Sequence, residues 1–237
     1  TTQRLGRDVI YLETVDSTNR YLRDLADQTP IATGTVVCAE TQTAGRGRFQ
    51  RHWESPAGGG IWFSLLLRPQ VPPAQASHFT LAAAVAVSET LRQEGISAGI
   101  KWPNDVLVEG RKVCGILAEM RGDCDNIDWL ILGIGLNVGI THFPQTVQKA
   151  ATSLALEGKN CPRPYLAAAI LNKLEPYCMM LETQGFSPIR QKWRTLSCML
   201  GDKVTVHTPK DDYCGIAEDL DENGCLVLRL AEGSRQV

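Results

Sequence analysis

The sequence has no apolar run of about 18 residues, the length that a membrane-spanning helix needs, and its start is not a charged segment followed by an apolar one. These absences argue against a membrane span and against secretion. Basic residues are not in excess either, because the formal net charge is −2, so nucleic acid is not expected as an electrostatic partner. With 43% hydrophobic residues among 237, the chain can bury a sizeable core, and we expect a globular, cytoplasmic protein.

The eight cysteines form no CxxC pair, and none of the four histidines lies at a spacing typical of zinc ligands. Without such pairs the sequence predicts neither a zinc site nor a disulfide framework. We expect free thiols that pack as small apolar side chains in a reducing compartment. No metal centre is predicted, and no cysteine–histidine nucleophile pair can be assembled from sequence neighbours.

A dinucleotide-binding fingerprint is also absent. Gly133, Gly135 and Gly139 follow the spacing GxGxxxG, and no helix is expected after them, so a Rossmann fold is not indicated. We interpret these glycines as positions where the backbone passes close to a ligand. The sequence contains no internal repeat and no low-complexity linker.

What the chain does contain is a basic segment with two glycines, TAGRGRFQRHW, at residues 43–53. Glycines at 45 and 47 let a ligand approach backbone N–H groups closely. The guanidinium groups carry charge that does not titrate at physiological pH. The segment therefore indicates a site for a carboxylate or a phosphate, although a solvated basic loop would have the same composition. Its arginines are Arg46, Arg48 and Arg51.

Four small polar residues, DSTN at 16–19, precede an apolar pattern typical of a helix. Asp16 or Ser17 can cap that helix, and one or two such residues are all that a helix start needs. The surplus hydroxyl and amide groups could bind a neutral polar ligand group such as a urea or an amide.

A third polar segment, IKWPNDVLVEGRKVCGILAE at 100–119, reads as a strand, a turn and a hairpin. Lys101 ends the first strand and Lys112 begins the last. Either lysine could be an ordinary surface charge, and Asp105 could be a turn cap.

The pattern of the whole chain predicts a mixed α/β fold. Helices are expected near 17–27, 75–94 and 163–182, and strands near 35–40, 61–68, 97–101, 106–108, 113–119 and 129–138. After a break near 187–198, residues 201–230 alternate apolar and polar side chains, with Asn223-Gly224 as a two-residue hairpin turn. This pattern predicts a small all-β module at the C-terminal end.

Six motifs together resemble the catalytic domain of biotin protein ligases over nearly the whole chain. They are DSTN at 16–19, ETQTAGRGR at 40–48 with Trp53 beyond it, SPAGGGIWFSLLLRP at 55–69, KWPND at 101–105, GRKVCGILAE at 110–119 and LGIGLNVG at 132–139, in the order that this family has. One departure is Gln50, where the family usually has glycine, which puts the closed shape of that loop in question.

The resemblance implies an α/β (α+β) fold in which a mixed sheet flanked by helices forms a class II synthetase-like catalytic domain. It divides the chain into a biotin- and ATP-binding domain at 1–186 and, at 187–237, a connector helix with a small SH3-like β-barrel. No helix-turn-helix precedes Asp8, so we expect a short form without DNA binding. None of the candidate ligand contacts falls in the β module, so we also expect adenylate formation to survive its removal.

The resemblance further implies ATP-dependent ligation of biotin to a lysine of the biotin carboxyl carrier protein of acetyl-CoA carboxylase, through biotinyl-5′-AMP, with Mg²⁺ bound by the nucleotide. Arg48 and Lys112 are the implied catalytic cations, and Asp105 would orient the acceptor lysine. The implied biotin contacts are Ser17, Thr18, Asn19, Gln42, Gly45, Arg46 and Gly115. The implied ATP contacts are Arg51, Trp53, Lys101, Asn104 and Asn137. Trp62 is expected beside Trp53 as a second aromatic wall or as core.

Two other functions stay open from the sequence. A lipoate or octanoate protein ligase or transferase has a related fold and a similar lysine, but it has no ureido group to bind, so the polar DSTN segment favours biotin. A non-catalytic RNA-binding module would explain the GRGR segment, yet it leaves both lysines without a role and lacks an aromatic stacking surface. The sequence leaves a homodimer open.

Overall fold

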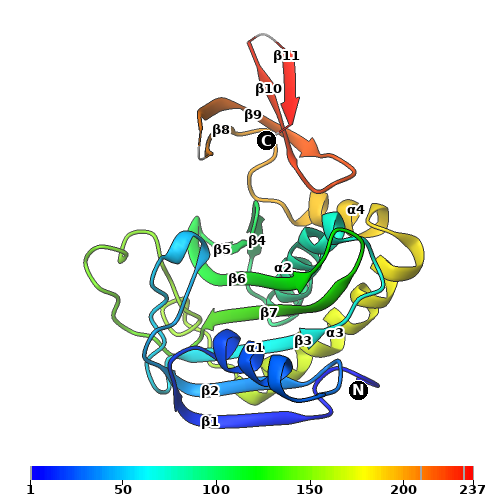
Figure 1. The fold of residues 1–237 in the computed structure, drawn as a ribbon. Coiled ribbons are helices and arrows are strands. Elements are labelled where there is room, and N and C mark those ends of the chain that lie inside the picture. Colours follow the sequence, from blue (N-terminus) through cyan, green and yellow to red (C-terminus); the bar gives the residue numbers. More distant parts are fainter. Residues whose placement is uncertain (1, 209, 232, 237) are drawn as a thin grey trace.

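A computed structural model describes residues 2–208, 210–231 and 233–236 of the chain. Its main feature is a seven-stranded sheet with the order β1-β2-β3-β7-β6-β5-β4 (Figure 1). The strands are β1 (Val9–Val15), β2 (Val36–Gln42), β3 (Gly60–Leu67), β4 (Ala98–Lys101), β5 (Asp105–Val108), β6 (Arg111–Gly122) and β7 (Ile127–Asn137). β1 runs parallel to β2, and the other neighbours are antiparallel. The mixed sheet that the sequence predicts is confirmed.

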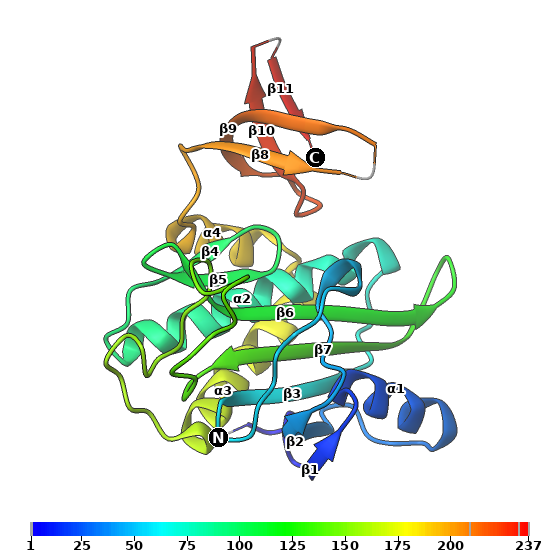
Figure 2. The same cartoon turned by 90° about the vertical axis from the view of Figure 1, so that its left-hand side faces the viewer.

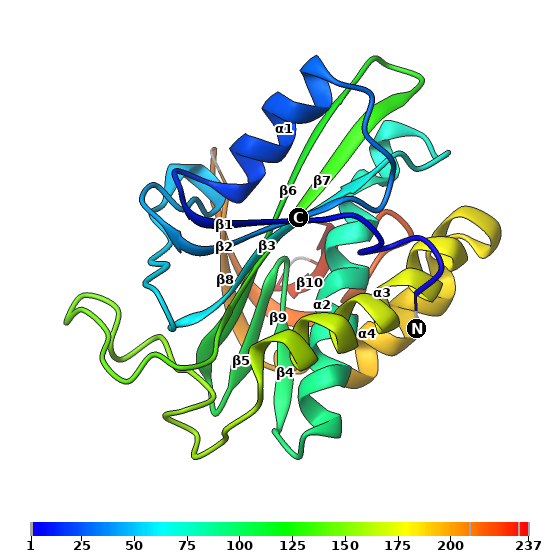
Figure 3. The same ribbon diagram turned by 90° about the horizontal axis from the view of Figure 1, so that it is seen from below.

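Helices cover both faces of this sheet (Figure 3). Helix α1 (Thr18–Gln28) packs on one face, where Leu22 meets Leu66 and Ile131 in a small apolar cluster. Helices α2 (Ala76–Gln93) and α3 (Arg163–Gln184) pack over the opposite face and form the larger core. Every residue of β3 is buried because the strand lies between these two layers. None of the described helices is long and apolar enough to cross a membrane.

The expected helices and strands agree with the structure to within a few residues, with one omission. β1 was not predicted: none of the residues of VIYLETV is fully buried, and only its inward-facing Ile10 and Leu12 pack against the apolar cluster under α1. β1 is an edge strand, and it connects through α1 to its parallel neighbour β2. This crossover brings the DSTN segment to the end of β1, beside the end of β2.

Helix α4 (Ser187–Leu196) leads to a second sheet, of four antiparallel strands in the order β11-β10-β9-β8 (Figure 2). The strands are β8 (Lys203–His207), β9 (Asp212–Leu220), β10 (Leu226–Leu230) and β11 (Gly233–Gln236). The β9–β10 turn has Gly224 at φ +80°, as its sequence suggests. Asp221 and Cys225 still pair through their backbones, so three residues form the turn rather than the predicted two.

The β9–β10 turn docks on the first sheet. The indole N–H of Trp102 donates to the carbonyl of Gly224 at 3.0 Å. On the other side of the turn, the buried ring of His78 on α2 stacks on Phe186, with ring centres 4.2 Å apart. Burial lowers the pKa of His78, so its imidazole is neutral at physiological pH. The two sheets are therefore joined through the loop that carries the KWPND motif.

Candidate active site

A cavity of about 900 Å³ opens on the α1 face of the large sheet. Its lining comes from the start of α1, residues 46–54, the loop at 101–105, the strands β6 and β7, and β8 of the small sheet. Every implied catalytic, biotin or ATP contact named from the sequence lines this cavity except Gly45, while Trp62 and Gly139 do not line it. The three polar segments, far apart in the chain, thus meet in one place.

The floor of the cavity is made of glycines on neighbouring strands. Gly115 of β6 pairs with Gly135 of β7, and two residues along, on the same face, Leu117 pairs with Gly133. A Cβ atom on Gly133 would lie 2.3 Å from Oδ1 of Asn19, and one on Gly135 would lie 2.6 Å from the indole nitrogen of Trp53. Both glycines line the cavity, and the side chains of Asn19 and Trp53 also pack against them. Our interpretation that the backbone here passes close to a ligand stays a prediction. Gly139 meets the backbone of Gly58 in the same way.

One end of the cavity is closed and lined by neutral polar groups. Ser17, Thr18 and Asn19 are each less than 5% exposed. Thr18 donates its N–H to Oε1 of Gln42 at 2.9 Å, and Gln42 donates through Nε2 to the hydroxyl of Ser55 at 2.8 Å. Ser17 occupies the N-cap position of α1 but makes no side-chain capping bond. Ser17 lines the cavity, and helix capping does not account for its hydroxyl.

Two residues that support this closed end from behind its lining were not found from the sequence. Ser64 of β3 is fully buried and lies 2.6 Å from Oδ1 of Asn19, and Glu119 of β6 accepts a hydrogen bond from Nδ2 of Asn19 at 2.7 Å. A signal for Ser64 was present, because it is the one hydroxyl residue in the apolar strand GIWFSLLL. Glu119 had no such signal, since an acidic residue near the end of a strand is common on protein surfaces.

The other end of the cavity is open and charged. Lys112 forms an ion pair with Asp105, with Nζ and Oδ1 2.6 Å apart, and its Nζ lies 5.2 Å from the ring centre of Trp53. Asn104 donates to the carbonyl of Ile116 at 2.8 Å, and Nη1 of Arg48 lies 3.5 Å from its Oδ1. Partial burial lowers the pKa of Arg48 and Asp105 counteracts this effect, but the guanidinium stays charged.

Residues 42–55 form a hairpin-like loop over this charged end. Its two arms pair through their backbones, with the N–H of Trp53 donating to Gly45 and that of Gly47 donating to Arg51. Gly45 is required sterically, because a Cβ there would lie 2.4 Å from the carbonyl oxygen of Trp53. At the tip, Phe49 and Gln50 adopt left-handed conformations with φ of 55° and 60°. Glycine at position 50 would adopt this conformation without steric cost.

Asn137 and Trp62 both make side-chain contacts within the protein. Nδ2 of Asn137 donates to the carbonyl of Thr152 at 3.0 Å, which fixes the segment after β7 beside the cavity. Among the described residues its Oδ1 makes no hydrogen bond, so this oxygen is still free to accept one. Trp62 is 1% exposed and meets the face of Trp53 edge-on, so it supports the cavity wall from within the core.

The small sheet also contributes to the cavity. Residues of β8 and the following turn, from Lys203 to Thr208, line it together with Met199. Our expectation that the C-terminal module is separate from the ligand contacts is therefore not supported by the geometry. The sequence could not show this proximity, because Trp102 and Gly224 are 122 positions apart.

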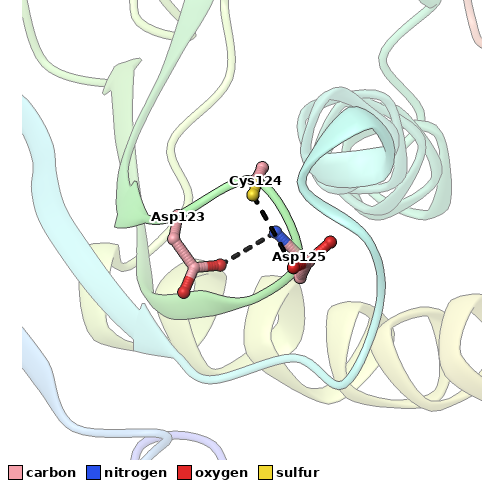
Figure 4. A group of neighbouring side chains, drawn as sticks. All are labelled: Asp123, Cys124 and Asp125. Carbon is pink, nitrogen blue, oxygen red and sulfur yellow. Dashed lines mark hydrogen bonds between the residues drawn. The ribbon is translucent and has the colours of Figure 1, made fainter.

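Within the described parts of the chain, the one group of acidic, cysteine or histidine side chains close enough to hold a metal ion lies outside the cavity. It consists of Asp123, Cys124 and Asp125 in the β6–β7 turn, at the opposite end of β6 from Lys112 (Figure 4). Oδ1 of Asp123 accepts the N–H groups of Asp125 and Asn126, and these bonds lower the pKa of Asp123. The group is exposed and its contacts are those of a tight turn. All eight cysteines of the chain are free thiols.

Comparison with known proteins identifies the class. The model of the biotin/lipoate A/B protein ligase family matches residues 11–137, and the chain belongs to this family. It is 37% identical over 240 residues to the bifunctional ligase/repressor BirA of Bacillus subtilis, covering 100% of this chain and 74% of that protein. It is 35% identical to the biotin–[acetyl-CoA-carboxylase] ligase of Paracoccus denitrificans, over 95% of each chain.

A solved structure agrees with this assignment. The biotin protein ligase of Aquifex aeolicus, in complex with biotin and ATP, superposes with a TM-score of 0.86 at 30% identity, covering 98% of this chain and 95% of that one. The resemblance to biotin protein ligases that six sequence motifs indicated is thus confirmed.

Proposed function

We propose that this protein uses ATP to activate biotin as biotinyl-5′-AMP and then transfers biotin to a lysine of a carrier protein. The observation that carries this proposal is the pairing of a closed, neutral polar end with an open, cationic end in one cavity. Biotin has the matching polarity, with a ureido ring at one end and a carboxylate at the other. The ligand-bound relative from Aquifex aeolicus and the acetyl-CoA-carboxylase ligases among the relatives support this choice of substrates.

The closed end offers the hydrogen-bonding groups that a urea needs. The hydroxyl of Ser17 and the second N–H of Gln42 are available to donate to the ureido carbonyl, and Oδ1 of Asn19 is available to accept from a ring N–H. Thr18 holds Gln42 in place through two contacts. Gly45, Arg46 and Gly115 would contact the chain that leads from the ring to the carboxylate.

The open end suits the first reaction step. A biotin carboxylate oxygen attacks the α-phosphorus of ATP, a P–O bond forms, and pyrophosphate leaves. Two anions must approach each other, so fixed cations lower the barrier. We assign this role to Lys112 and Arg48, with Arg51 and Lys101 holding the outer phosphates. Asn104 would place the phosphates, Trp53 would form a wall, and Oδ1 of Asn137 would accept from the adenine amino group.

We infer that Mg²⁺ enters as part of the nucleotide. Asp105, a carboxylate that lines the open end, is already paired with Lys112, and among the described residues the group with metal-like spacing is at the far end of β6. Mg²⁺ usually keeps several water ligands and is held by substrate phosphates, so a protein cage is not required.

In the second step the amine of an acceptor lysine attacks the carbonyl carbon of biotinyl-AMP and expels AMP. We assign Asp105 to orient that amine, because it lies beside Lys112 at the mouth of the cavity. The names of the acetyl-CoA-carboxylase ligases support the biotin carboxyl carrier protein as acceptor. We further propose that residues 1–186 are the catalytic domain and that the sheet β8–β11 after helix α4 is an SH3-like module.

A lipoate or octanoate ligase is the alternative, since the family includes lipoate enzymes. Incubation with ATP and biotin, octanoate or lipoate in turn, with pyrophosphate release as the readout, tests the choice. We expect release with biotin and at most a few per cent of that rate with either fatty acid. Faster release with lipoate or octanoate than with biotin would overturn the proposal, and so would the absence of release with all three acids.

A further inference from the structure

The side-chain amide of Asn19 is surrounded by protein groups that determine which way it faces. Asn19 is 4% exposed. Its Nδ2 donates to Oε2 of Glu119 at 2.7 Å and lies 3.4 Å from the carbonyl oxygen of Leu117. Its Oδ1 lies 2.6 Å from the hydroxyl of Ser64.

Counting donors and acceptors shows what Asn19 can offer a ligand. A primary amide has two N–H donors and an oxygen with two lone pairs. Both donors of Asn19 point at acceptors of the protein, and the Ser64 hydroxyl uses one lone pair. The second lone pair remains for the cavity. Asn19 can therefore accept a hydrogen bond from a ligand but cannot donate one.

Glu119 and the Leu117 carbonyl fix this orientation, and Ser64 does not. A carboxylate and a carbonyl can only accept hydrogen bonds, so the NH₂ group must face them. A serine hydroxyl can donate or accept, and it would tolerate a flipped amide equally well. Since the main-chain carbonyl is at 3.4 Å, a marginal distance, the carboxylate of Glu119 makes the stronger contact.

Glu119 acts from outside the cavity. It is not among the lining residues, and it stands on β6 opposite Ile131, two residues beyond Leu117, which pairs with Gly133. The missing side chain of Gly133 lets the Asn19 amide lie flat against β7 and reach Glu119, because a Cβ there would meet Oδ1 at 2.3 Å. The contact thus depends on the glycine floor of the closed end.

We propose that Glu119 is a positioning residue for substrate selection, because it holds the carbonyl oxygen of Asn19 toward the ligand. The closed end then accepts a ring N–H, as in a ureido group, and disfavours acids that have no donor there. A site that is built to hydrogen-bond a ligand group strongly rejects an analogue without that group, because the buried polar atom of the site is then left without a partner. This inference rests on the proposed function and deepens it, since it names the group that accepts the ureido N–H, which is Oδ1 of Asn19, and the residue that orients it, which is Glu119.

The test compares biotin with an analogue that has oxygen in place of both ureido nitrogens, using calorimetric binding to the full chain. We expect Glu119→Leu to weaken biotin binding roughly tenfold to a hundredfold, as for loss of a hydrogen bond to a charged group. Its affinity for the analogue should change little, so the ratio of the two affinities falls toward one. Glu119→Gln keeps an acceptor oxygen and should retain the ratio to within about threefold. The KM for ATP should not change in either variant.

Each outcome separates the two claims. If the wild-type protein binds no biotin, the proposed function fails and this inference fails with it. If wild type binds biotin and the folded Glu119→Leu variant keeps the wild-type ratio, only the inference is overturned, and the contact merely stabilises the start of α1. Should Glu119→Leu not fold, Glu119→Lys answers the same question, because an ammonium can only donate and would turn the amide around. An unchanged ratio in that variant would also overturn the inference.

Discussion

The two ends of the cavity differ in how firmly the protein holds their polar and charged groups. At the closed end, Thr18 and Asn19 are buried, and nearly all of their polar atoms are already bonded within the protein. At the open end, Arg48 and Lys101 are exposed, and Lys112 is held by Asp105, a partner that a substrate anion would replace. The neutral polar groups of the closed end are thus held in place before a ligand binds. At the open end, by contrast, the ion pair of Lys112 with Asp105 must be broken when a substrate anion binds. This arrangement suits a substrate that is held by one end while its other end reacts.

The largest effect is expected from Lys112→Ala at the open end. Removing one partner of a desolvated charge pair costs about 2 to 5 kcal/mol, which is roughly 30-fold to several-thousand-fold in rate if the contact forms mainly in the transition state. Biotin affinity should fall by less than the rate. Biotin-dependent exchange of labelled pyrophosphate into ATP measures the rate, and a thermal melt checks that the variant folds.

Lys149→Ala provides the matched control, because Lys149 is exposed and does not line the cavity. It should exchange pyrophosphate at the wild-type rate. Wild-type exchange by Lys112→Ala would remove this lysine from the mechanism and leave the open end without its central cation.

The sequence predicted the open end better than the closed one, for a physical reason. Charged residues in glycine- and proline-containing turns, such as Arg48 and Lys112, indicate a site by their type and local spacing alone. The Asn19–Glu119 contact joins positions 100 apart, and no local pattern encodes such a distance. Similarly, the fold was predicted where strands are apolar, as in β3, and β1 was missed because it is an exposed edge strand. The docking of the small sheet depends on Trp102 and His78, which the sequence shows only as ordinary turn and helix residues.

A smaller effect is expected where the open end rests on the small sheet. Trp102→Phe keeps an aromatic ring but removes the hydrogen bond from the indole to Gly224. Because Lys101 and Asn104 flank this residue, the loss of about 1 kcal/mol should raise the KM for ATP roughly fivefold and leave the KM for biotin unchanged. Steady-state kinetics with each substrate varied in turn would measure both constants.

Trp129→Phe is the control for this substitution, since it removes an indole hydrogen bond of 2.8 Å to Asp27 on the α1 face, away from the small sheet. It should lower stability without changing either KM. If Trp102→Phe raised both KM values equally, the contact would support the whole cavity and the two ends would not be independent.

The smallest effect is expected at the tip of the loop over the open end, where Gln50 has φ +60°. A non-glycine residue in this conformation costs about 1 kcal/mol, and glycine removes that cost but loses part of the gain to its greater freedom in the unfolded chain. Gln50→Gly should therefore tighten the loop by only a few tenths of a kcal/mol, while Gln50→Val, which is β-branched, should loosen it by more. The rate of trypsin cleavage between Arg46 and Arg51 reports on the loop, and we expect it to follow the order Val, Gln, Gly from fastest to slowest. Biotin should slow cleavage in all three proteins if the loop orders over the substrate. Equal cleavage with and without biotin would mean that the loop over the open end is already ordered before the ligand binds, as the groups of the closed end are.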